Sequence, residues 1–486
     1  MSEIANLSPR AVWQYFDEIT QVPRPSKKEG KIRAYLIEFA KRHNLEYAED
    51  ATGNVVIRKP ATAGRETYPT VILQSHMDMV CEKNGDVEFD FEKDAIRTRI
   101  DGEWVRAEGT TLGADCGIGM AAALAMLTDS NVEHGPIEAL FTVDEETGLT
   151  GAFGLGDGML TGKYLINLDS EDEGEIFIGC AGGLDTLGTF HYTPEPAPAG
   201  LVWFRIHLFG LKGGHSGDDI EKGRGNSNKL LNRFLAYGTA AFALRLADFN
   251  GGNLRNAIPR EASALFGVPV EYVKPMLAYF ETYKADVLAE YAVTDPSFEI
   301  TLAEETAPAE VVDLATQRRL LDAICGLPNG VLAMSHAVEG LVETSTNLAS
   351  VKFPERGVIV VTTSQRSSVG SARDEAAASV EAVLRLAGAD VIHSDGYPGW
   401  NPNPDSYLLR LTEKTYQDLF NKAPKVRAIH AGLECGLFLE KYPHLEMVSF
   451  GPTLRGVHSP DERLEIATVD KFWKLLAGVI AAIEKQ

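Results

Sequence analysis

Three apolar runs in the first third of the chain each lead into acidic or histidine side chains. The runs and the polar residues at their ends are 68–74 with His76 and Asp78, 137–143 with Glu145 and Glu146, and 163–168 with Asp169. Short β-branched and aliphatic runs of this kind are typical of buried strands. Because α/β sheets carry their ligand sites at the carboxyl ends of strands, the pattern predicts an α/β fold with a polar cluster at one sheet edge.

His76 and Asp78 are two positions apart, so in an extended chain their side chains point to the same face. A hydrogen-bonded pair at a strand end explains this spacing as well as a ligand site does. The three consecutive acids at 144–146 repel one another unless positive charge lies nearby, although an exposed loop could carry them. Whether other parts of the chain supply further ligand residues decides which of these interpretations is correct.

A glycine-rich turn surrounds a further acid, Asp115. Gly113, Gly117 and Gly119 flank it, and an apolar, alanine-rich helix follows. Such a turn can hold phosphate at a helix start, but this one has no lysine and places a carboxylate in its middle. Close backbone packing around Asp115 accounts better for the glycines.

The length and the Pro-rich stretches indicate more than one domain. A chain of 486 residues is long enough for two, and Pro/Gly-rich segments at 191–200 and 396–406 resemble linkers. We therefore expect a catalytic domain from 1–186 and 402–486, interrupted by an inserted domain at 187–401.

The charge balance excludes several classes of partner. The net charge of −23, from 46 basic and 69 acidic residues, argues against nucleic acid and anionic membranes. The first residues show no basic segment followed by an apolar one, and no apolar run approaches the ~18 residues of a membrane span, so we expect a cytoplasmic protein. Five scattered cysteines without C-x-x-C spacing predict neither disulfides nor a structural zinc site.

Five candidate metal ligands lie near strand ends or turns: His76, Asp115, Glu146, Asp169 and His458. Two imidazoles and three carboxylates suit Zn²⁺, Mn²⁺ or Co²⁺. Five ligands are too many for one open catalytic ion but fit two ions that share a bridging carboxylate. A metal pair also offsets the acidic run, and one acid of the 145–146 pair can then serve as general base beside the metals.

Six ordered motifs resemble those of the aminoacyl-histidine dipeptidases (Xaa-His or β-alanyl-histidine dipeptidases), carnosinase-like two-zinc exopeptidases. The motifs are SHMDMV, GTTLGADCGIGMA, FTVDEETGLTGA, INLDSEDEG, GGHSGDDI and GVHSPDER. The similarity covers essentially the whole chain, including the size of the insert. It implies a mixed-sheet α/β catalytic domain with an inserted α+β domain that acts as lid and homodimerisation surface.

The resemblance also implies a ligand set for two zinc ions. His76 and Asp169 would bind one ion, His458 and Glu146 the other, and Asp115 would bridge the two.

Two further residues of the catalytic domain receive implied roles. Asp78 would orient His76 by accepting its second N–H. Glu145 would be the general base that takes a proton from a metal-bridging water and passes it to the leaving amine.

The remaining candidates lie mostly in the insert. His215 matches a histidine that relatives use to stabilise the oxyanion, often from the partner subunit; a capping histidine in a glycine-rich turn is the alternative. Arg366 resembles an arginine that pairs with the substrate's terminal carboxylate, or it is a solvated strand arginine. Asn256 and Asn347 are further substrate-binding candidates, and Glu434 lies in a loop that, in relatives, lies beside the substrate.

We therefore expect a metal-dependent hydrolase of dipeptides with a free N-terminus. An enclosed lid selects dipeptides by size, whereas the preference for Xaa-His and carnosine-like substrates rests on the resemblance alone. The alternatives are a broader dipeptidase or cysteinylglycinase, an N-acyl-amino-acid deacylase of the same superfamily and, in another class, a non-catalytic metal-stabilised binding protein. A non-catalytic binding protein would have no use for an acid that lies beside the metals without binding them, as Glu145 is expected to do.

Overall fold

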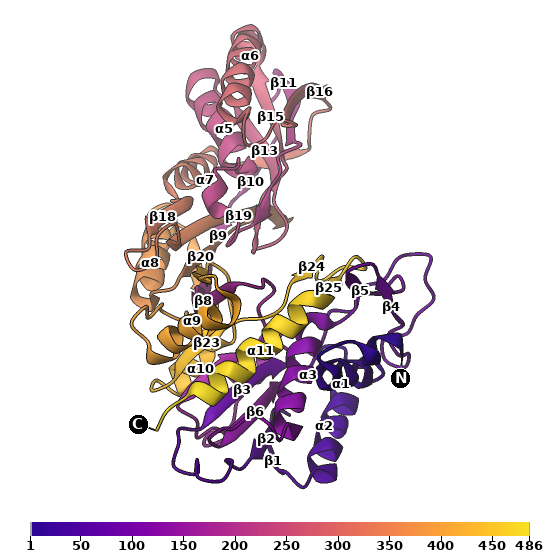
Figure 1. Cartoon of the computed structure of the whole chain (residues 1–486). Coiled ribbons are helices and arrows are strands. Elements are labelled where there is room, and N and C mark those ends of the chain that lie inside the picture. Colours follow the sequence, from indigo (N-terminus) through magenta and orange to yellow (C-terminus); the bar gives the residue numbers. More distant parts are fainter. Residues whose placement is uncertain (1, 486) are drawn as a thin grey trace. The chain divides into compact units, whose positions relative to one another are not determined.

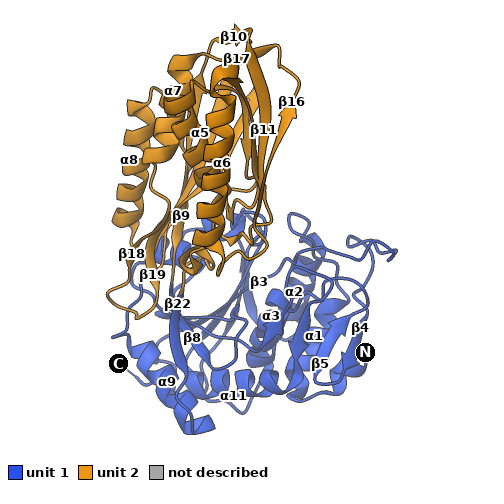
Figure 2. Cartoon of the chain, turned by 90° about the horizontal axis from the view of Figure 1, so that it is seen from above, with its two compact units in different colours: residues 1–179, 402–428, 434–486 blue, residues 180–401, 429–433 orange. Residues whose placement is uncertain are grey.

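The computed structural model describes residues 2–485 and divides the chain into two compact units (Figures 1 and 2). The first unit comprises Met1–Gly179, Pro402–Ala428 and Glu434–Gln486, and the second comprises Cys180–Asn401 and Ile429–Leu433. The second unit begins ahead of the expected position 187 because β9 (Gly182–His191) already pairs with strands of its sheet.

The main sheet of the first unit has eight strands in the order β1-β2-β6-β3-β7-β23-β8-β22. Their bounds are β1 Glu46–Glu49, β2 Val55–Lys59, β3 Val71–His76, β6 Ile137–Thr142, β7 Tyr164–Asn167, β8 Glu175–Cys180, β22 Lys425–Ile429 and β23 Glu446–Ser449. The neighbours β6, β3, β7 and β23 are parallel to one another. Every residue of β3, β6 and β7 is buried, as expected for a parallel sheet covered on both faces.

The helices of the first unit cover this sheet, and Figure 1 shows α11 lying across one face of it. Their bounds are η1 Glu3–Asn6, α1 Arg10–Thr20, α2 Gly30–Arg42, α3 Ala114–Thr128, α4 Thr150–Phe153, α9 Tyr407–Phe420, α10 Cys435–Lys441 and α11 Ile466–Ala482. Helix α3 is rich in alanine, a strong helix former, and is buried on every side.

One glycine lets α3 approach the end of β7 closely. A Cβ added to Gly119 would lie 2.6 Å from the Leu168 carbonyl oxygen, so only glycine fits there. This close approach brings the start of α3, with Asp115, beside Asp169, as the close-packing interpretation of the glycines predicts.

A second, four-stranded sheet in the same unit was not predicted from the sequence. Its order is β24-β25-β5-β4, with bounds β4 Thr98–Asp101, β5 Trp104–Ala107, β24 Leu454–Arg455 and β25 Arg463–Glu465. The turn between β24 and β25 contains His458.

The second unit is an α+β domain built on a nine-stranded sheet. Its main path is β16-β11-β15-β13-β19-β20-β9-β21, with β18 paired to β19, and β10-β17 and β12-β14 form two small ladders. The remaining strand bounds are β10 Pro194–Pro196, β11 Leu201–Phe209, β12 Gly214–His215, β13 Arg245–Gly251, β14 Ala257–Ile258, β15 Ala262–Pro269, β16 Glu299–Glu305, β17 Glu310–Val312, β18 Gly330–Met334, β19 Val342–Glu355, β20 Val358–Ser367 and β21 Asp390–His393.

The helices of the second unit share one core with this sheet. Their bounds are η2 Ile220–Lys222, α5 Ser227–Phe242, α6 Val270–Tyr291, α7 Leu314–Gly326 and α8 Gly370–Leu386. Phe234, Phe280, Leu320 and Val380, one from each α-helix, lie in a single apolar cluster with sheet residues. Helices segregated to one face of an antiparallel sheet are typical of the α+β class.

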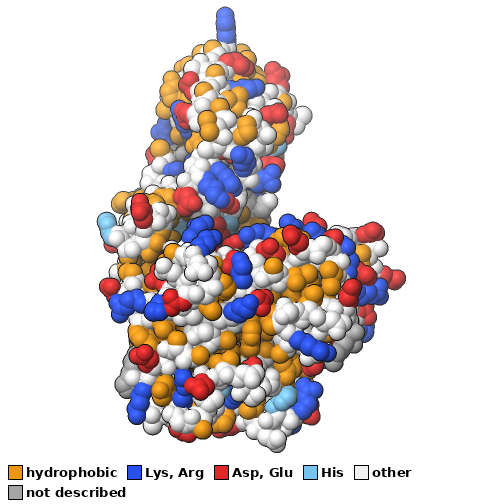
Figure 3. All heavy atoms as spheres, in the orientation of Figure 1, with side chains coloured by type: hydrophobic (Ala, Val, Ile, Leu, Met, Phe, Trp, Pro, Cys, Tyr) orange, Lys and Arg blue, Asp and Glu red, His pale blue; other side chains and the backbone are white. Residues whose placement is uncertain are grey.

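The surface carries mixed charge. Figure 3 shows Lys and Arg side chains interspersed with Asp and Glu on the visible face of each unit, with no continuous basic patch there. Among residues 2–485, no helix combines the length and apolar character that crossing a membrane requires.

Candidate active site

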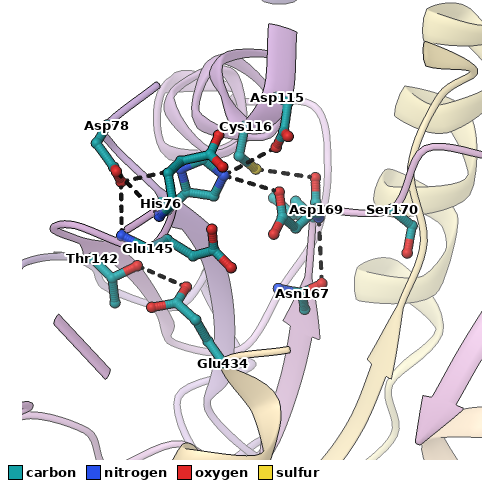
Figure 4. Close-up of polar contacts among 12 residues, drawn as sticks. His76, Asp78, Asp115, Cys116, Thr142, Glu145, Asn167, Asp169, Ser170 and Glu434 are labelled. Carbon is teal, nitrogen blue, oxygen red and sulfur yellow. Dashed lines mark hydrogen bonds and ion pairs between the residues drawn. The ribbon is translucent and has the colours of Figure 1, made fainter. Parts of the chain in front are cut away.

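The parallel strands of the main sheet end at one edge, and the predicted polar residues gather there (Figure 4). The residues that the strand ends, α3 and the β24–β25 turn bring to this edge are His76, Asp78, Asp115, Glu145, Glu146, Asp169 and His458. Because the carboxyl ends of parallel strands meet at the same edge, the sheet topology itself assembles the cluster.

Asp115 lies between the two imidazoles. Its Oδ1 is 3.0 Å from His76 Nε2, and its Oδ2 is 3.2 Å from His458 Nε2. His76 Nε2 is also 3.4 Å from Asp169 Oδ1, and His458 Nε2 is 3.0 Å from Glu146 Oε2. Each imidazole is thus shared between its own carboxylate and one oxygen of Asp115, which is the arrangement of a bridging ligand.

The donor set fits metal ions better than it fits hydrogen bonds alone. Glu146 Oε1 is buried and has no hydrogen-bond partner among residues 2–485, and the buried Asp169 Oδ1 has only its 3.4 Å contact with His76 Nε2, which is not a hydrogen bond. One set of ligand atoms within 4.8 Å of one another comes from Asp115, Glu146 and His458, and a second comes from His76, Cys116 and Asp169. Glu145 joins His76 and Glu146 in a further set. Two imidazoles with carboxylates at this spacing could hold two divalent ions.

The electrostatics of the cluster favour bound positive charge. Burial raises the pKa of Asp169 to about 6, and the charge of Asp115 adds to this effect. Burial acts to lower the pKa of His76, but Asp169, Asp115 and other carboxylates hold it well above its usual range. Hydrogen bonds to Asp115 and Glu146 raise the pKa of His458 to about 11. Bound cations would relieve this excess of buried carboxylate.

Asp78 faces His76 from the side opposite Asp115. Its Oδ1 is 3.3 Å from His76 Nδ1 and accepts the backbone N–H of Glu145 at 3.1 Å, while its Oδ2 accepts the Ser26 hydroxyl at 2.8 Å. Although burial acts to raise it, the contacts with His76 and Ser26 hold the pKa of Asp78 below its usual range. With its oxygens occupied by donors, Asp78 is suited to orient His76.

Glu145 and Glu146 are neighbouring acids with different contacts. The Glu145 carboxylate makes no hydrogen bond or ion pair within residues 2–485, whereas that of Glu146 contacts His458. Figure 4 shows the Glu145 side chain pointing toward the space between His76, Asp169 and Glu434. Burial raises the pKa of Glu145 well above its usual range, and the charges of Asp169 and Glu434 add to this although His76 opposes it. A carboxylate held beside the ligands without a partner can take up a proton.

Glu434 lies in the same unit and is 2% exposed. Its Oε2 accepts hydrogen bonds from Gln74 Nε2 at 2.6 Å and Thr142 Oγ1 at 2.9 Å, whereas its Oε1 is buried without a partner. Burial raises the pKa of Glu434 to about 8.

Three of these supporting side chains were not predicted. Ser26 lies in a polar loop, and Gln74 and Thr142 lie within apolar strand sequences, so nothing in their local sequence marks them.

The other four predicted residues lie in the second unit. Three of them meet at the β12–β14 ladder, where His215 pairs with Ala257. Asn347 Nδ2 donates to the Ala257 carbonyl at 2.8 Å, and the Asn256 carbonyl accepts the Ser216 N–H at 2.8 Å. The structure therefore brings His215, Asn256 and Asn347 together.

His215 is held in one tautomer by its own turn. Its Nδ1 accepts the backbone N–H groups of Gly217 and Asp218, each at 3.3 Å. In a neutral imidazole the proton then resides on Nε2, which leaves an N–H donor free. These contacts are those expected of a capping histidine, and they also leave the Nε2–H of His215 able to donate to a ligand.

Arg366 is 7% exposed, so the interpretation as a solvated strand arginine is wrong. Its Nη1 donates to the Tyr397 hydroxyl at 3.0 Å, and its Nε has no partner among residues 2–485. It pairs across β19 and β20 with Ser345, and regular alternation places it on the face opposite Ile359 and the helices. A buried guanidinium without a carboxylate partner is suited to an anionic ligand.

Comparisons with known proteins agree with this fold and site. Residues 72–482 match the model of peptidase family M20/M25/M40. The chain is 46% identical over 486 residues to a cytosol non-specific dipeptidase of Escherichia coli strain K12, covering 99% of each protein. The crystal structure of aminoacylhistidine dipeptidase from Vibrio alginolyticus superimposes with a TM-score of 0.93 at 46% identity, covering 100% of this chain and 99% of that one.

The chain therefore belongs to peptidase family M20/M25/M40, which confirms the resemblance and the predicted fold class. A more distant structure, an aminopeptidase from Bacillus cereus, has a TM-score of 0.61 at 17% identity over 98% of this chain and 99% of its own. At that identity the likeness shows the fold alone.

Proposed function

We propose that this chain is a metal-dependent dipeptidase that hydrolyses dipeptides with a free N-terminus. The observation that carries the proposal is the position of Asp115, whose two oxygens face His76 and His458, next to the unpartnered carboxylate of Glu145. The names of the two relatives at 46% identity, both dipeptidases, support it.

The cofactor in this proposal is a pair of divalent ions, with zinc as the expected metal and Mn²⁺ or Co²⁺ as alternatives. His76 and Asp169 would hold one ion, Glu146 and His458 the other, and Asp115 both. When bound, the ions supply Lewis-acid chemistry to a water and to the scissile carbonyl.

The chain's own residues then carry the proton and the developing charge. Glu145 takes a proton from the attacking water and delivers it to the leaving nitrogen. Asp78, whose Oδ1 lies 3.3 Å from His76 Nδ1, would accept the Nδ1–H of His76 and so fix the tautomer that presents Nε2. His215, through its Nε2–H, would donate to the oxyanion, an interaction that is strongest in the transition state.

Substrate recognition would use the ends of the dipeptide. Glu434, with one buried oxygen free, is proposed to face the substrate's ammonium group, and Arg366 its carboxylate. Asn256 and Asn347 would supply amide hydrogen bonds. We further propose that the second unit acts as lid and homodimerisation surface and that the protein works in the cytoplasm, as the name of the Escherichia coli relative suggests for that protein.

Substrate preference is tested by a panel on purified protein. The two relatives at 46% identity differ in name, one non-specific and one for aminoacyl-histidines, and we propose Xaa-His and carnosine-like substrates as the preferred class. Turnover of carnosine and another Xaa-His dipeptide is expected to exceed that of Cys-Gly, with no hydrolysis of an N-acetyl amino acid. Equal rates on Cys-Gly would favour a broader dipeptidase, and activity on the N-acetyl compound alone would exclude a peptidase.

His215→Ala is expected to lower kcat far more than it raises KM, because the donor acts on the transition state. Loss of one oxyanion donor costs about 10²–10³-fold in kcat. His336→Ala, which removes an exposed histidine of the same unit, is the control and should leave both constants unchanged. An unaltered kcat in the His215 variant would mean that this residue only caps its own turn.

Metal binding is expected to release protons. Neighbouring carboxylates raise the pKa of both His76 and His458, which favours their protonated forms, and a metal ion must displace those protons. Titration calorimetry in buffers of different ionisation enthalpy should show proton release, and the apparent affinity should rise with pH. Binding without proton release would mean that the imidazoles are neutral before metal arrives.

A further inference from the structure

Two buried residues of opposite charge bind the backbone of one residue beside the proposed metal ligands. Arg24 and Glu462 are each 2% exposed, and neither has a role in the chemistry above. The residue between them is Gly113, two positions before Asp115.

Glu462 accepts hydrogen bonds from four consecutive backbone N–H groups. Its Oε2 accepts from Leu112 at 2.8 Å and Gly113 at 3.0 Å, and its Oε1 accepts from Ala114 at 2.7 Å and Asp115 at 3.4 Å. Gly113 is the N-cap of α3, and Ala114 and Asp115 are its first two residues, so three of these N–H groups belong to the helix start, where intrahelical acceptors are absent. Glu462 thus fixes the backbone that presents the Asp115 side chain.

Glu462 also ties that backbone to a second ligand. It lies four residues after His458, in the turn that leads into β25, and is joined to that turn by its own N–H, which donates to the Ser459 carbonyl at 3.0 Å. Glu462 therefore links the backbone at Asp115 to the turn that carries His458.

Arg24 links the segment that carries a third proposed ligand, His76, to the same glycine. Its Nη1 donates to the carbonyls of Met77, at 3.2 Å, and Asp78, immediately after His76, and its Nη2 donates to the carbonyl of Gly113. Burial lowers the pKa of Arg24, while the charges of Asp78 and Glu462 act to raise it.

Gly113 must be glycine for this contact to exist. It has a φ of +70°, and an added Cβ would lie 2.6 Å from Arg24 Nη2. Its N–H is held by Glu462 and its carbonyl by Arg24, so the two charges act on one residue from opposite sides.

We propose that Arg24 and Glu462 are positioning residues that set the spacing of the metal ligands by clamping Gly113 between them. The clamp joins the end of β3 with His76, the start of α3 with Asp115 and the β24–β25 turn with His458. This inference rests on the proposed metal pair. Because Glu462 links Asp115 to His458, its loss should weaken the ion held by His458 and Glu146 more than the ion held by His76 and Asp169.

The test is Glu462→Gln, which keeps the shape but replaces one acceptor oxygen with an amide that faces two N–H donors. Co²⁺ is titrated into metal-free protein and followed by visible absorption, and bound metal is counted after equilibrium dialysis. Wild type should bind two ions, and the variant should bind one of them 10–100-fold more weakly, the usual effect of losing a partner behind the ligands. Asp461→Asn, an exposed acid next in sequence, is the matched control and should bind both ions as wild type does.

The outcomes separate this inference from the proposed function. Two ions bound with wild-type affinities in the Glu462→Gln variant would overturn the clamp alone, whereas fewer than two ions in wild type would overturn the metal pair and the clamp with it. If Glu462→Gln does not fold, Glu462→Asp, which keeps the charge but shortens the reach, takes its place. Selective weakening of one ion in that variant supports the clamp, and two unchanged affinities contradict it.

Discussion

Replacing Glu145 with glutamine is expected to reduce turnover by at least 10²–10⁴-fold while two metal ions per chain remain bound. Glutamine has nearly the same shape but cannot take a proton from water. The Glu145 carboxylate makes no hydrogen bond within residues 2–485. Asp78 accepts the backbone N–H of residue 145, and this hydrogen bond does not depend on the side chain at that position. The substitution should therefore remove the proton acceptor without disturbing the ligands.

The same change one residue further on is the matched control. Glu146 Oε2 lies 3.0 Å from His458 Nε2, so Glu146→Gln should weaken metal binding itself. Initial rates and metal content measured on both variants separate the two roles. Loss of metal from the Glu145 variant would mean that Glu145 is a ligand, and near-normal turnover would mean that another group accepts the proton.

Asp115→Ala is expected to abolish turnover together with binding of both ions. The two oxygens of Asp115 face different imidazoles, so removing them takes one ligand from each site and lets two positive ions repel across the gap. Metal analysis after dialysis should find close to no bound metal, and far-UV circular dichroism should remain that of the wild type.

A nearby acid serves as the control for Asp115. Asp172 forms a surface ion pair with Arg455 at 2.7 Å, and such pairs contribute little, so Asp172→Ala should retain both ions and its activity. One ion bound tightly in the Asp115 variant would contradict the bridging role.

The part of the site that the sequence predicts is the part built from strand ends. His76 ends one apolar strand, Glu146 and Asp169 follow two others, and the parallel order of β3, β6 and β7 brings these ends together. Residues outside that pattern, Asp115 and His458, were reached through the chemistry of the ligand set and the resemblance.

What local sequence could not predict are contacts between distant segments. Glu462 binds the N–H groups of residues 112–115, about 350 positions away, and nothing near it in sequence marks it as buried. The four-stranded sheet was missed for the same reason, since β24 and β25 are short and β25 pairs with β5, more than 350 positions earlier in the chain. The burial of Arg366 likewise depends on strands that pair only in the folded second unit.

The most direct test of the central claim measures dipeptide turnover as metal is added back to chelator-treated protein. Metal-free protein should be inactive on carnosine and other dipeptides, and activity should reach its maximum when two ions are bound per chain. Full activity without metal, or a maximum reached with one bound ion and no second binding event, would contradict a two-metal dipeptidase.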